Sequence, residues 1–314
     1  MDIRSFDSEY VEKNLDMPGC VELMEDTLLK LHRGGFEQYL RTGQPMPGGN
    51  IIAFMPAFCF DGYFGAKILS VFPKNSRDGF PSHQGQILIF DGEHGELKAL
   101  VDATSVTKIR TGAVSGAASK YLARKDSKIL ALLGAGEQAE SHLKAISGLF
   151  ALDEVRVWNH NKSKAESFCG AHRAIAGGAV LKAADSAEEA VRGADIICTL
   201  TPSKEPVVKY EWIKPGAHIN AVGACTKDAR ELDTETVRRA RFFCDSVESV
   251  MAEAGDYVIP MNEGAFGKEH LVGTLGQLFA GEIEGRTSDE DITIFESLGL
   301  AAEDLAAAKY LMDK

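Results

Sequence analysis

The sequence lacks several features that would direct its interpretation elsewhere. Its six cysteines include no C-x-x-C pair, which argues against a zinc, iron–sulfur or other metal site and is typical of reduced thiols in a cytoplasm. No uninterrupted apolar run approaches the roughly 18 residues of a membrane span. The acidic N-terminus, MDIRSFDSEY, has no apolar core of a signal peptide. We therefore expect a cytoplasmic protein with no membrane partner.

Positive charge is also scarce. Lys and Arg number 34 against 46 Asp and Glu, a formal net charge of −12. This balance, without a dense basic stripe, argues against nucleic acid as a partner. Hydrophobic residues at 45% and charged residues at 25% are ordinary for a globular protein. The 314 residues are enough for about two domains.

Residues 128–139, KILALLGAGEQA, combine a strand with a nucleotide-binding turn. Residues 129–133 are apolar without a break, as in a strand buried on both faces. Three small residues follow with the spacing G-x-G-x-x-A. They would allow a tight turn, the approach of a pyrophosphate and close packing of the next helix, whose free N–H groups would bind phosphate. The residues assigned to this cofactor-binding turn are Gly134, Gly136, Glu137, Gln138 and Ala139.

Strands and helices alternate from residue 128 to about 246. The expected strands are 129–133, 155–158, 179–182, 195–200, 217–222 and 241–245, and the expected helices are 137–149, 162–175, 186–192 and 233–240. This alternation predicts an α/β fold, a Rossmann-type doubly wound parallel sheet with right-handed crossovers.

The flanking segments predict a second, α+β domain. They comprise an amphipathic helix over 12–33, apolar strands at 51–55, 67–72, 86–90 and 97–101, and a long helix over 104–122. Residues 246–286 are mostly helical in pattern, residues 293–295 could begin a strand or a helix, and a final helix over 301–312 would fold back onto the first domain. We expect residues 1–122 plus 290–314 in that domain, around a Rossmann domain at 123–289.

No carboxylate follows the second strand of the Rossmann pattern. Sites that prefer NAD usually place an acid there, whereas this chain has Asn159, His160 and Lys162. Neutral or basic groups accommodate a 2′-phosphate, so NADP(H) is favoured and NAD(H) is the alternative; a solvated helix start explains the same residues equally well. Thr199 and Thr201 follow the fourth strand, where such folds contact the adenosine half of the dinucleotide. An ordinary turn at the end of the strand is the alternative interpretation.

Several motifs occur in order along the chain: FMPAF (54–58), GAKILSVFPKN (65–75), KIRTGAVSGAAS (108–119), LLGAGEQAESH (132–142), KPGAHINAVGA (214–224), RELD (230–233) and SLGLAAEDLAAA (297–308). Together they resemble the ornithine cyclodeaminase/mu-crystallin family over nearly the whole chain. The resemblance implies a homodimer, whose first domain binds substrate and forms the dimer, and a nicotinamide cofactor. It also implies a small 2-amino or 2-imino acid substrate.

The resemblance also implies roles for individual residues. Basic residues of the first domain, Arg41, Lys67 and Arg110, would hold the substrate carboxylate, which suits guanidinium and ammonium groups. His83 is a candidate proton donor, although a structural histidine is the stronger alternative. Four further residues complete the expected cofactor site: Thr111 at the pyrophosphate, and Val222, Ser297 and Gly299 around the nicotinamide.

Two positions depart from the cyclodeaminase pattern. Members that are cyclodeaminases resemble one another in carrying an aspartate after the INAVG-like strand, where this chain has Cys225. They also carry a glutamate at the position where this chain has Ala53. Both acids that would handle a diamine are missing, whereas mu-crystallin-like members carry serine at the first position and reduce cyclic ketimines with NADPH. Cys225 could be a weak substitute base or a small packed residue.

The leading hypothesis is therefore an NAD(P)H-dependent imine reductase for a small 2-imino acid, such as a cyclic ketimine, pyrroline-2-carboxylate or an iminodicarboxylate. The first alternative is an ornithine cyclodeaminase or an alanine or other amino-acid dehydrogenase. A third, of another class, is a mu-crystallin-like protein that binds a small hydrophobic ligand.

Overall fold

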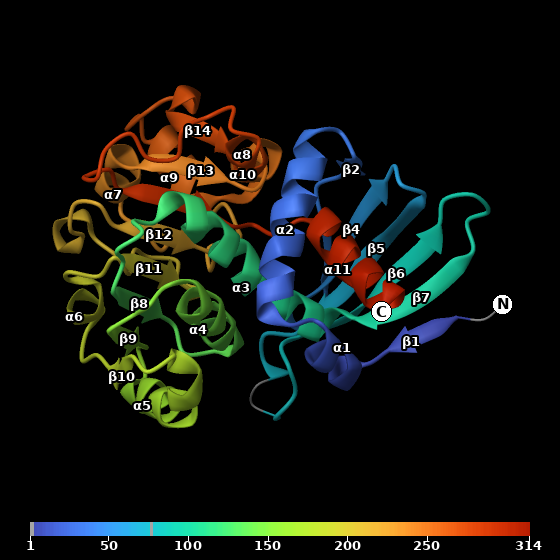
Figure 1. Cartoon of the computed structure of the whole chain (residues 1–314), viewed down its shortest axis with the longest axis horizontal. Coiled ribbons are helices and arrows are strands. Elements are labelled where there is room, and N and C mark those ends of the chain that lie inside the picture. Colours follow the sequence, from blue (N-terminus) through green and yellow to red (C-terminus); the bar gives the residue numbers. More distant parts are fainter. Residues whose placement is uncertain (1–2, 76–77) are drawn as a thin grey trace. The chain divides into compact units, whose positions relative to one another are not determined.

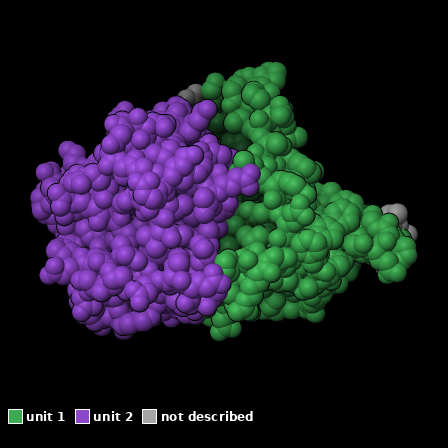
Figure 2. All heavy atoms as spheres, turned by 90° about the horizontal axis from the view of Figure 1, so that it is seen from above, with its two compact units in different colours: residues 1–110, 299–314 green, residues 111–298 purple. Residues whose placement is uncertain are grey.

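The computed structural model describes residues 3–75 and 78–314 of the chain. The described chain forms two compact units: unit 1 comprises residues 1–110 and 299–314, and unit 2 comprises residues 111–298 (Figure 2). The boundaries thus fall at Arg110 and Leu298 instead of the expected 122 and 289. The physical reason is that the long helix is shared between the units and that residues 293–296 form a strand within the sheet of unit 2.

Unit 1 is built on one seven-stranded sheet in the order β1-β7-β6-β5-β4-β2, with β3 paired to β4. All neighbours are antiparallel except β1 and β7, which are parallel. The strands are β1 (Arg4–Phe6), β2 (Phe36–Gln38), β3 (Thr42–Met46), β4 (Asn50–Cys59), β5 (Tyr63–Val71), β6 (His83–Asp91) and β7 (Leu97–Asp102).

Helices cover one face of this sheet. Helix α11 (Ala301–Asp313, red in Figure 1) contacts β4, β5, β6 and α2 (Met17–His32), so the C-terminal segment does return to the first domain, as expected. The residues of β4 that face these helices alternate with outward-facing ones, because successive side chains of a strand point to opposite faces.

The expected helix over 12–33 is two helices, α1 (Ser8–Asn14) and α2. Asp16 accepts a hydrogen bond from the Gly19 N–H at 2.9 Å and caps a new helix, and a proline occupies its first turn. A side-chain acceptor and a proline both favour a helix start over continuation, so the chain breaks at this point.

Unit 2 has an eight-stranded sheet in the order β10-β9-β8-β11-β12-β15-β13-β14, with every neighbouring pair parallel. Its first five strands follow the doubly wound order 3-2-1-4-5, and β15, the last strand in the chain, lies between β12 and β13. This parallel arrangement confirms the predicted Rossmann-type α/β fold. The strands are β8 (Ile129–Leu133), β9 (Glu154–Trp158), β10 (Val180–Ala183), β11 (Ile196–Thr199), β12 (His218–Ala221), β13 (Arg241–Cys244), β14 (Leu271–Thr274) and β15 (Thr293–Glu296).

Two apolar clusters occupy the two faces of this sheet. Successive residues of β8, such as Leu130 and Ala131, point to opposite faces, belong to different clusters and are fully buried. This is why these strands read as unbroken apolar runs. The helices are α3 (Ala103–Leu122), shared with unit 1, α4 (Glu137–Leu149), α5 (Lys162–Ala171), α6 (Ala187–Val191), α7 (Thr234–Arg239), α8 (Val247–Glu253), α9 (Gly255–Asn262) and α10 (Leu275–Phe279).

Four short strands were absent from the sequence prediction: β1, β2, β3 and β14. Their burial shows little alternation, and β3 has every residue exposed, so neither periodicity nor hydrophobicity marks them. In the part of the chain that the structure describes, no helix is long and apolar enough to span a membrane. The same residues contain no cluster of His, Cys, Asp or Glu suited to a metal ion.

Candidate active site

Lys67 lies on β5 and points toward the helices of unit 1. Its register partners are Met55 on β4 and Ile87 on β6, both buried. The lysine is only 2% exposed, and its Nζ lies 2.6 Å from Oδ2 of Asp304 and 3.3 Å from Oγ1 of Thr107. A buried ammonium needs such partners, because desolvation of an unpaired charge is costly.

Arg110, at the unit boundary within α3, binds the same helix start. Its Nη1 donates to Oε2 of Glu303 at 2.8 Å and its Nε donates to Oδ1 of Asp304 at 3.0 Å. Glu303 and Asp304 occupy the first turn of α11, where carboxylates are favoured by the helix dipole. We call Lys67, Arg110, Glu303 and Asp304 the charged cluster; its formal charges sum to zero.

Burial sets the electrostatics of this cluster. Burial, together with the positive charges of Arg110 and Arg41, lowers the pKa of Lys67 to about 8, while Asp304 opposes the shift. Arg41 is therefore near Lys67, on the segment between β2 and β3. The structure thus brings together the three basic residues that the resemblance assigned to the substrate carboxylate.

His83 begins β6 and is exposed. Its Nδ1 lies 2.9 Å from Oγ of Ser82, and its backbone carbonyl accepts from Thr104. Its role as a proton donor stays a prediction.

Gly299 precedes α11 with φ +78°, a conformation that favours glycine. A Cβ at this position would lie 2.8 Å from Nη1 of Arg110. The residue assigned to the nicotinamide from the sequence therefore has a packing role against Arg110 in unit 1.

The glycine turn of unit 2 has the geometry expected of a dinucleotide site. It lies between β8 and α4, and β8 neighbours β11 at the point where the strand order reverses, which is where such sheets bind ligands. Gly134 has φ +126°, and a Cβ there would meet the Leu200 carbonyl oxygen of the next loop at 2.7 Å. At Gly136, a Cβ would meet nothing within 4 Å, so the backbone is open to a ligand.

Helix α4 begins directly after this opening. Gly136 is its N-cap, with no side-chain capping bond, so the first N–H groups are available to a phosphate. Ala139 is fully buried, consistent with its assigned role in helix–strand packing, whereas Glu137 is exposed. The turn therefore fits a pyrophosphate on the evidence of its own residues.

The residues after β9 are exposed or half-buried. Asn159 accepts a hydrogen bond from the Asn161 N–H at 2.9 Å, and His160 is exposed. Lys162 begins α5 and forms an exposed ion pair with Asp185. Such pairs are weak, so Lys162 can still turn toward a ligand phosphate.

Buried carboxylates hold the loops at the carboxyl ends of β11 and β12. Glu231 accepts from the N–H and the hydroxyl of Thr201, both at 2.6 Å, and from the Gly223 N–H at 2.8 Å. Burial and the charge of Asp256 raise the pKa of Glu231 to about 8. Glu231 thus fixes the turn that carries Thr201.

The other predicted cofactor residues of unit 2 are more enclosed than expected for ligand contacts. They are Thr111, Gln138, Thr199, Val222 and Ser297, of which all but Gln138 are less than a tenth exposed. The Ser297 N–H donates to the Ala221 carbonyl at 2.8 Å and extends the pairing of β15 with β12. Their contribution to cofactor binding stays a prediction.

Cys225 is half-buried, and its thiol donates to the Val222 carbonyl at 3.3 Å. It lies close enough to Glu296 to help raise the pKa of that carboxyl, which burial raises most. A neutral thiol at this position supplies no base comparable to a carboxylate.

Sequence reasoning missed three acidic residues of these sites: Glu303, Asp304 and Glu231. The signal was present, because two adjacent acids interrupt the otherwise apolar run AAEDLAAA. Such charges within a helix that packs on a sheet require buried partners.

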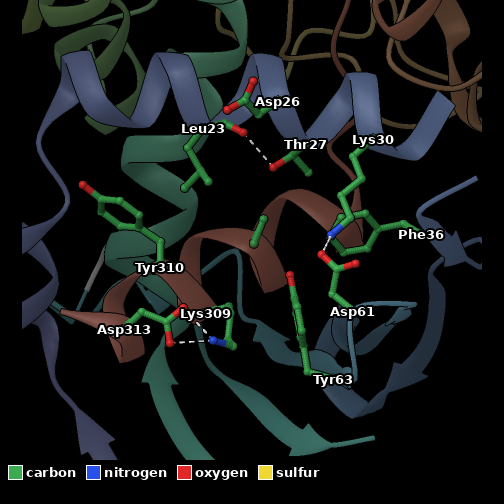
Figure 3. Close-up of a pocket in the computed structure, with 11 residues that line it drawn as sticks. Leu23, Asp26, Thr27, Lys30, Phe36, Asp61, Tyr63, Lys309, Tyr310 and Asp313 are labelled. Atoms are coloured by element: carbon green, nitrogen blue, oxygen red, sulfur yellow. Dashed lines mark hydrogen bonds and ion pairs between the residues drawn. The ribbon is translucent and has the colours of Figure 1, made fainter. Parts of the chain in front are cut away.

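A separate cavity of about 340 Å³ lies between α2 and α11 (Figure 3). Lys30 pairs there with Asp61, and Lys309 pairs with Asp313. No member of the charged cluster lines this cavity, and both of its lysines are neutralised. We assign it no part in the chemistry.

Comparison with known proteins identifies the family. The model of the ornithine cyclodeaminase/mu-crystallin family matches residues 5–314. Ketimine reductase mu-crystallin of Rattus norvegicus is 38% identical over 282 residues, covering 89% of this chain and 86% of the relative. Alanine dehydrogenase of Archaeoglobus fulgidus is 35% identical over 307 residues, covering 97% and 92%.

Solved structures agree with this assignment. Thermococcus litoralis Delta(1)-pyrroline-2-carboxylate reductase, in complex with NADH and L-proline, superimposes with a TM-score of 0.95. It is 38% identical, and the match covers 99% of this chain and 97% of the reductase. Reductase and dehydrogenase relatives at this identity make the protein an oxidoreductase. The chain belongs to the ornithine cyclodeaminase/mu-crystallin family.

Proposed function

We propose that the protein reduces the C=N bond of a small 2-imino acid at the expense of a reduced nicotinamide cofactor. The observation that supports this most directly is Lys67. It is buried, its pKa is lowered to about 8, and two guanidinium groups lie nearby. Perturbed pKa values of this kind cluster at functional sites.

The reaction adds a hydride to carbon and a proton to nitrogen. When bound, the nicotinamide supplies the hydride. Lys67 is protonated at neutral pH and, with a pKa near 8, is well matched to donate the proton to the imine nitrogen. The product is the corresponding 2-amino acid.

Arg41 carries the carboxylate contact in this proposal. The charged cluster is neutral in sum, since Lys67 and Arg110 face Glu303 and Asp304. Arg41 lies near Lys67, and its planar guanidinium suits a bidentate contact with a substrate carboxylate.

A diamine substrate has less support. Ala53 is buried in β4 and Cys225 offers only a thiol, so neither position supplies the acid that a second amine requires. Incubation with L-ornithine and NAD, with detection of proline and ammonia, tests the cyclodeaminase alternative.

The decisive experiment measures oxidation of NADPH and NADH with a panel of imines. The panel contains cyclic ketimines, pyrroline-2-carboxylate and an iminodicarboxylate. Turnover of at least one imine supports the proposal. Absence of turnover with every imine, together with tight binding of a small hydrophobic ligand, would replace it with the binding-protein alternative.

We propose NADP(H) as the preferred cofactor, with NAD(H) as the alternative. No carboxylate follows β9, and Lys162 is held there only by an exposed ion pair. The Thermococcus litoralis reductase is in complex with NADH, so both cofactors need direct comparison. A kcat/KM that strongly favours NADH over NADPH would contradict this choice.

We also propose a homodimer formed through the outer face of the unit 1 sheet. Phe64 stacks on Phe58 and on Phe90 from the neighbouring strands, with ring centroids 6.3 and 5.2 Å apart. Ile52 and Phe54 on the same face are 45% and 43% exposed. An apolar cavity of about 470 Å³ opens among these side chains. Contiguous exposed apolar surface of this kind marks an interface, and a second copy would cover it.

A further inference from the structure

Asp304 makes a contact to each cation of the charged cluster. Its Oδ2 lies 2.6 Å from Nζ of Lys67, and its Oδ1 accepts from Nε of Arg110 at 3.0 Å. The carboxylate therefore joins β5 to α3 through an ion pair with Lys67 and a charge-assisted hydrogen bond from Arg110. Rotation of its side chain would break both contacts.

The surroundings of this bridge are closed to solvent. Asp304 is 0% exposed and Lys67 is 2% exposed, so water does not screen the pair. The charges of Arg110 and Arg41 repel that of Lys67. Without a negative charge in contact, a buried lysine in this position would lose its proton.

Glu303 has a different set of contacts. Its Oε2 accepts from Nη1 of Arg110 at 2.8 Å and from the Leu300 N–H at 3.2 Å. The second bond is part of the cap of α11. The two adjacent carboxylates thus have different contacts: Glu303 caps α11 and binds Arg110, whereas Asp304 also contacts Lys67.

We propose that Asp304 is a positioning residue that directs the Lys67 ammonium and keeps it protonated for the reaction. This inference rests on the proposed role of Lys67 as proton donor. Asp304 has no contact with substrate in this scheme and acts through Lys67.

Asp304→Asn tests the inference, because it preserves the side-chain shape and removes the charge. The descending alkaline limb of the kcat/KM profile should move to lower pH by roughly 1–3 units, the effect of a close opposite charge. At pH 8 a shift of one unit from a pKa of about 8 corresponds to a loss of roughly fivefold, and a larger shift to a greater loss. The KM for the nucleotide should not change.

Two variants serve as controls. Glu303→Gln removes the neighbouring carboxylate that anchors Arg110 and caps α11, so activity can fall but the alkaline limb should stay in place. Asp304→Glu keeps the charge and displaces it, so kcat should fall while the limb stays near its wild-type position. If Asp304→Asn fails to fold, identical limbs in Asp304→Glu and wild type, with equal kcat, would overturn the inference.

A direct titration makes the test independent of turnover. NMR of lysine side chains labelled at the ε-carbon, with the Lys67 signal assigned from Lys67→Arg, reports its protonation without substrate. A lower Lys67 pKa in Asp304→Asn supports the inference, and an unchanged one overturns it. If no imine is reduced but the Lys67 titration still shifts, the proposed function fails while Asp304 still governs Lys67.

Discussion

At the scale of single residues, the proposed chemistry depends on one buried lysine, Lys67, whose charge is opposed by Asp304. Its burial works against the ammonium form and Asp304 works in its favour, so its pKa falls to about 8 instead of remaining near 10.5. This places the proton within reach of chemistry at neutral pH.

Lys67→Met should lower kcat by about 10²–10⁴-fold, the usual contribution of a positioned proton donor. Nucleotide affinity, measured by fluorescence titration with NADPH, should stay within error of wild type. Lys98→Met is the matched control, because Lys98 is an exposed residue of β7 with surface ion pairs. Equal activity of Lys67→Met and Lys98→Met would exclude Lys67 from the reaction.

The pH dependence of wild-type kcat/KM follows from the same residue. Lys67 is protonated below its pKa of about 8, so its titration should leave kcat/KM unchanged at lower pH. Above it, the rate should fall about tenfold per pH unit as the donor is lost. A rate that rises through pH 8–10 would assign the lysine the opposite role of a base.

At the scale of elements, the β8–α4 turn separates a structural glycine from a binding glycine. Gly136 faces open space, whereas a Cβ on Gly134 would meet the loop after β11. Replacing Gly136 should therefore affect ligand binding, and replacing Gly134 should affect folding.

Gly136→Val should weaken NADPH and NADH binding by about tenfold or more, since a side chain would fill the space for the pyrophosphate. Its Tm should change little. Gly148→Ala, in the same helix and equally open, is the control: it should keep nucleotide affinity and gain about 1 kcal/mol of stability. Nucleotide Kd and thermal unfolding distinguish the two outcomes.

The buried carboxylates around β15 make unit 2 sensitive to alkaline pH. Burial raises the pKa of Glu296 well above its ordinary value, so the folded state keeps a proton that the unfolded state releases. Stability therefore falls as pH rises above the unfolded value, by roughly 1.4 kcal/mol per pH unit for one proton.

Glu296→Gln replaces the protonated carboxyl with a neutral group of equal shape. Its Tm should depend less on pH between 5 and 9 than that of wild type, and it should exceed wild type at the alkaline end. Thermal unfolding across this range, monitored by circular dichroism, measures the difference. A Tm lower than wild type at every pH would indicate that Glu296 is ionised.

At the scale of the whole molecule, the proposed dimer interface is the outer face of the unit 1 sheet. If this interface forms, Phe54→Asp should give a monomer in light scattering after gel filtration, because it places a charge in the apolar patch. Phe80→Asp is the control, since Phe80 is 62% exposed but lies on the loop between β5 and β6 and not on a strand. A wild-type monomer would contradict the proposed interface.

The sequence alone determined the Rossmann-type fold, the glycine turn and the family. Buried parallel strands read as apolar runs, and a dinucleotide turn requires small residues at fixed spacing, so both leave a local pattern. β8 and α4 begin and end where the sequence predicted. Lys67 and Arg110 were also recognisable, because they interrupt apolar or small-residue runs.

Only the tertiary structure decided what those cations contact and where the units divide. Asp304 lies more than 200 residues from Lys67 in sequence, and the fold brings them to 2.6 Å. β15 reads equally as a strand or a helix start until its pairing with β12 and β13 settles it. Long-range pairing and burial carry no local signature, and they set the protonation of Lys67.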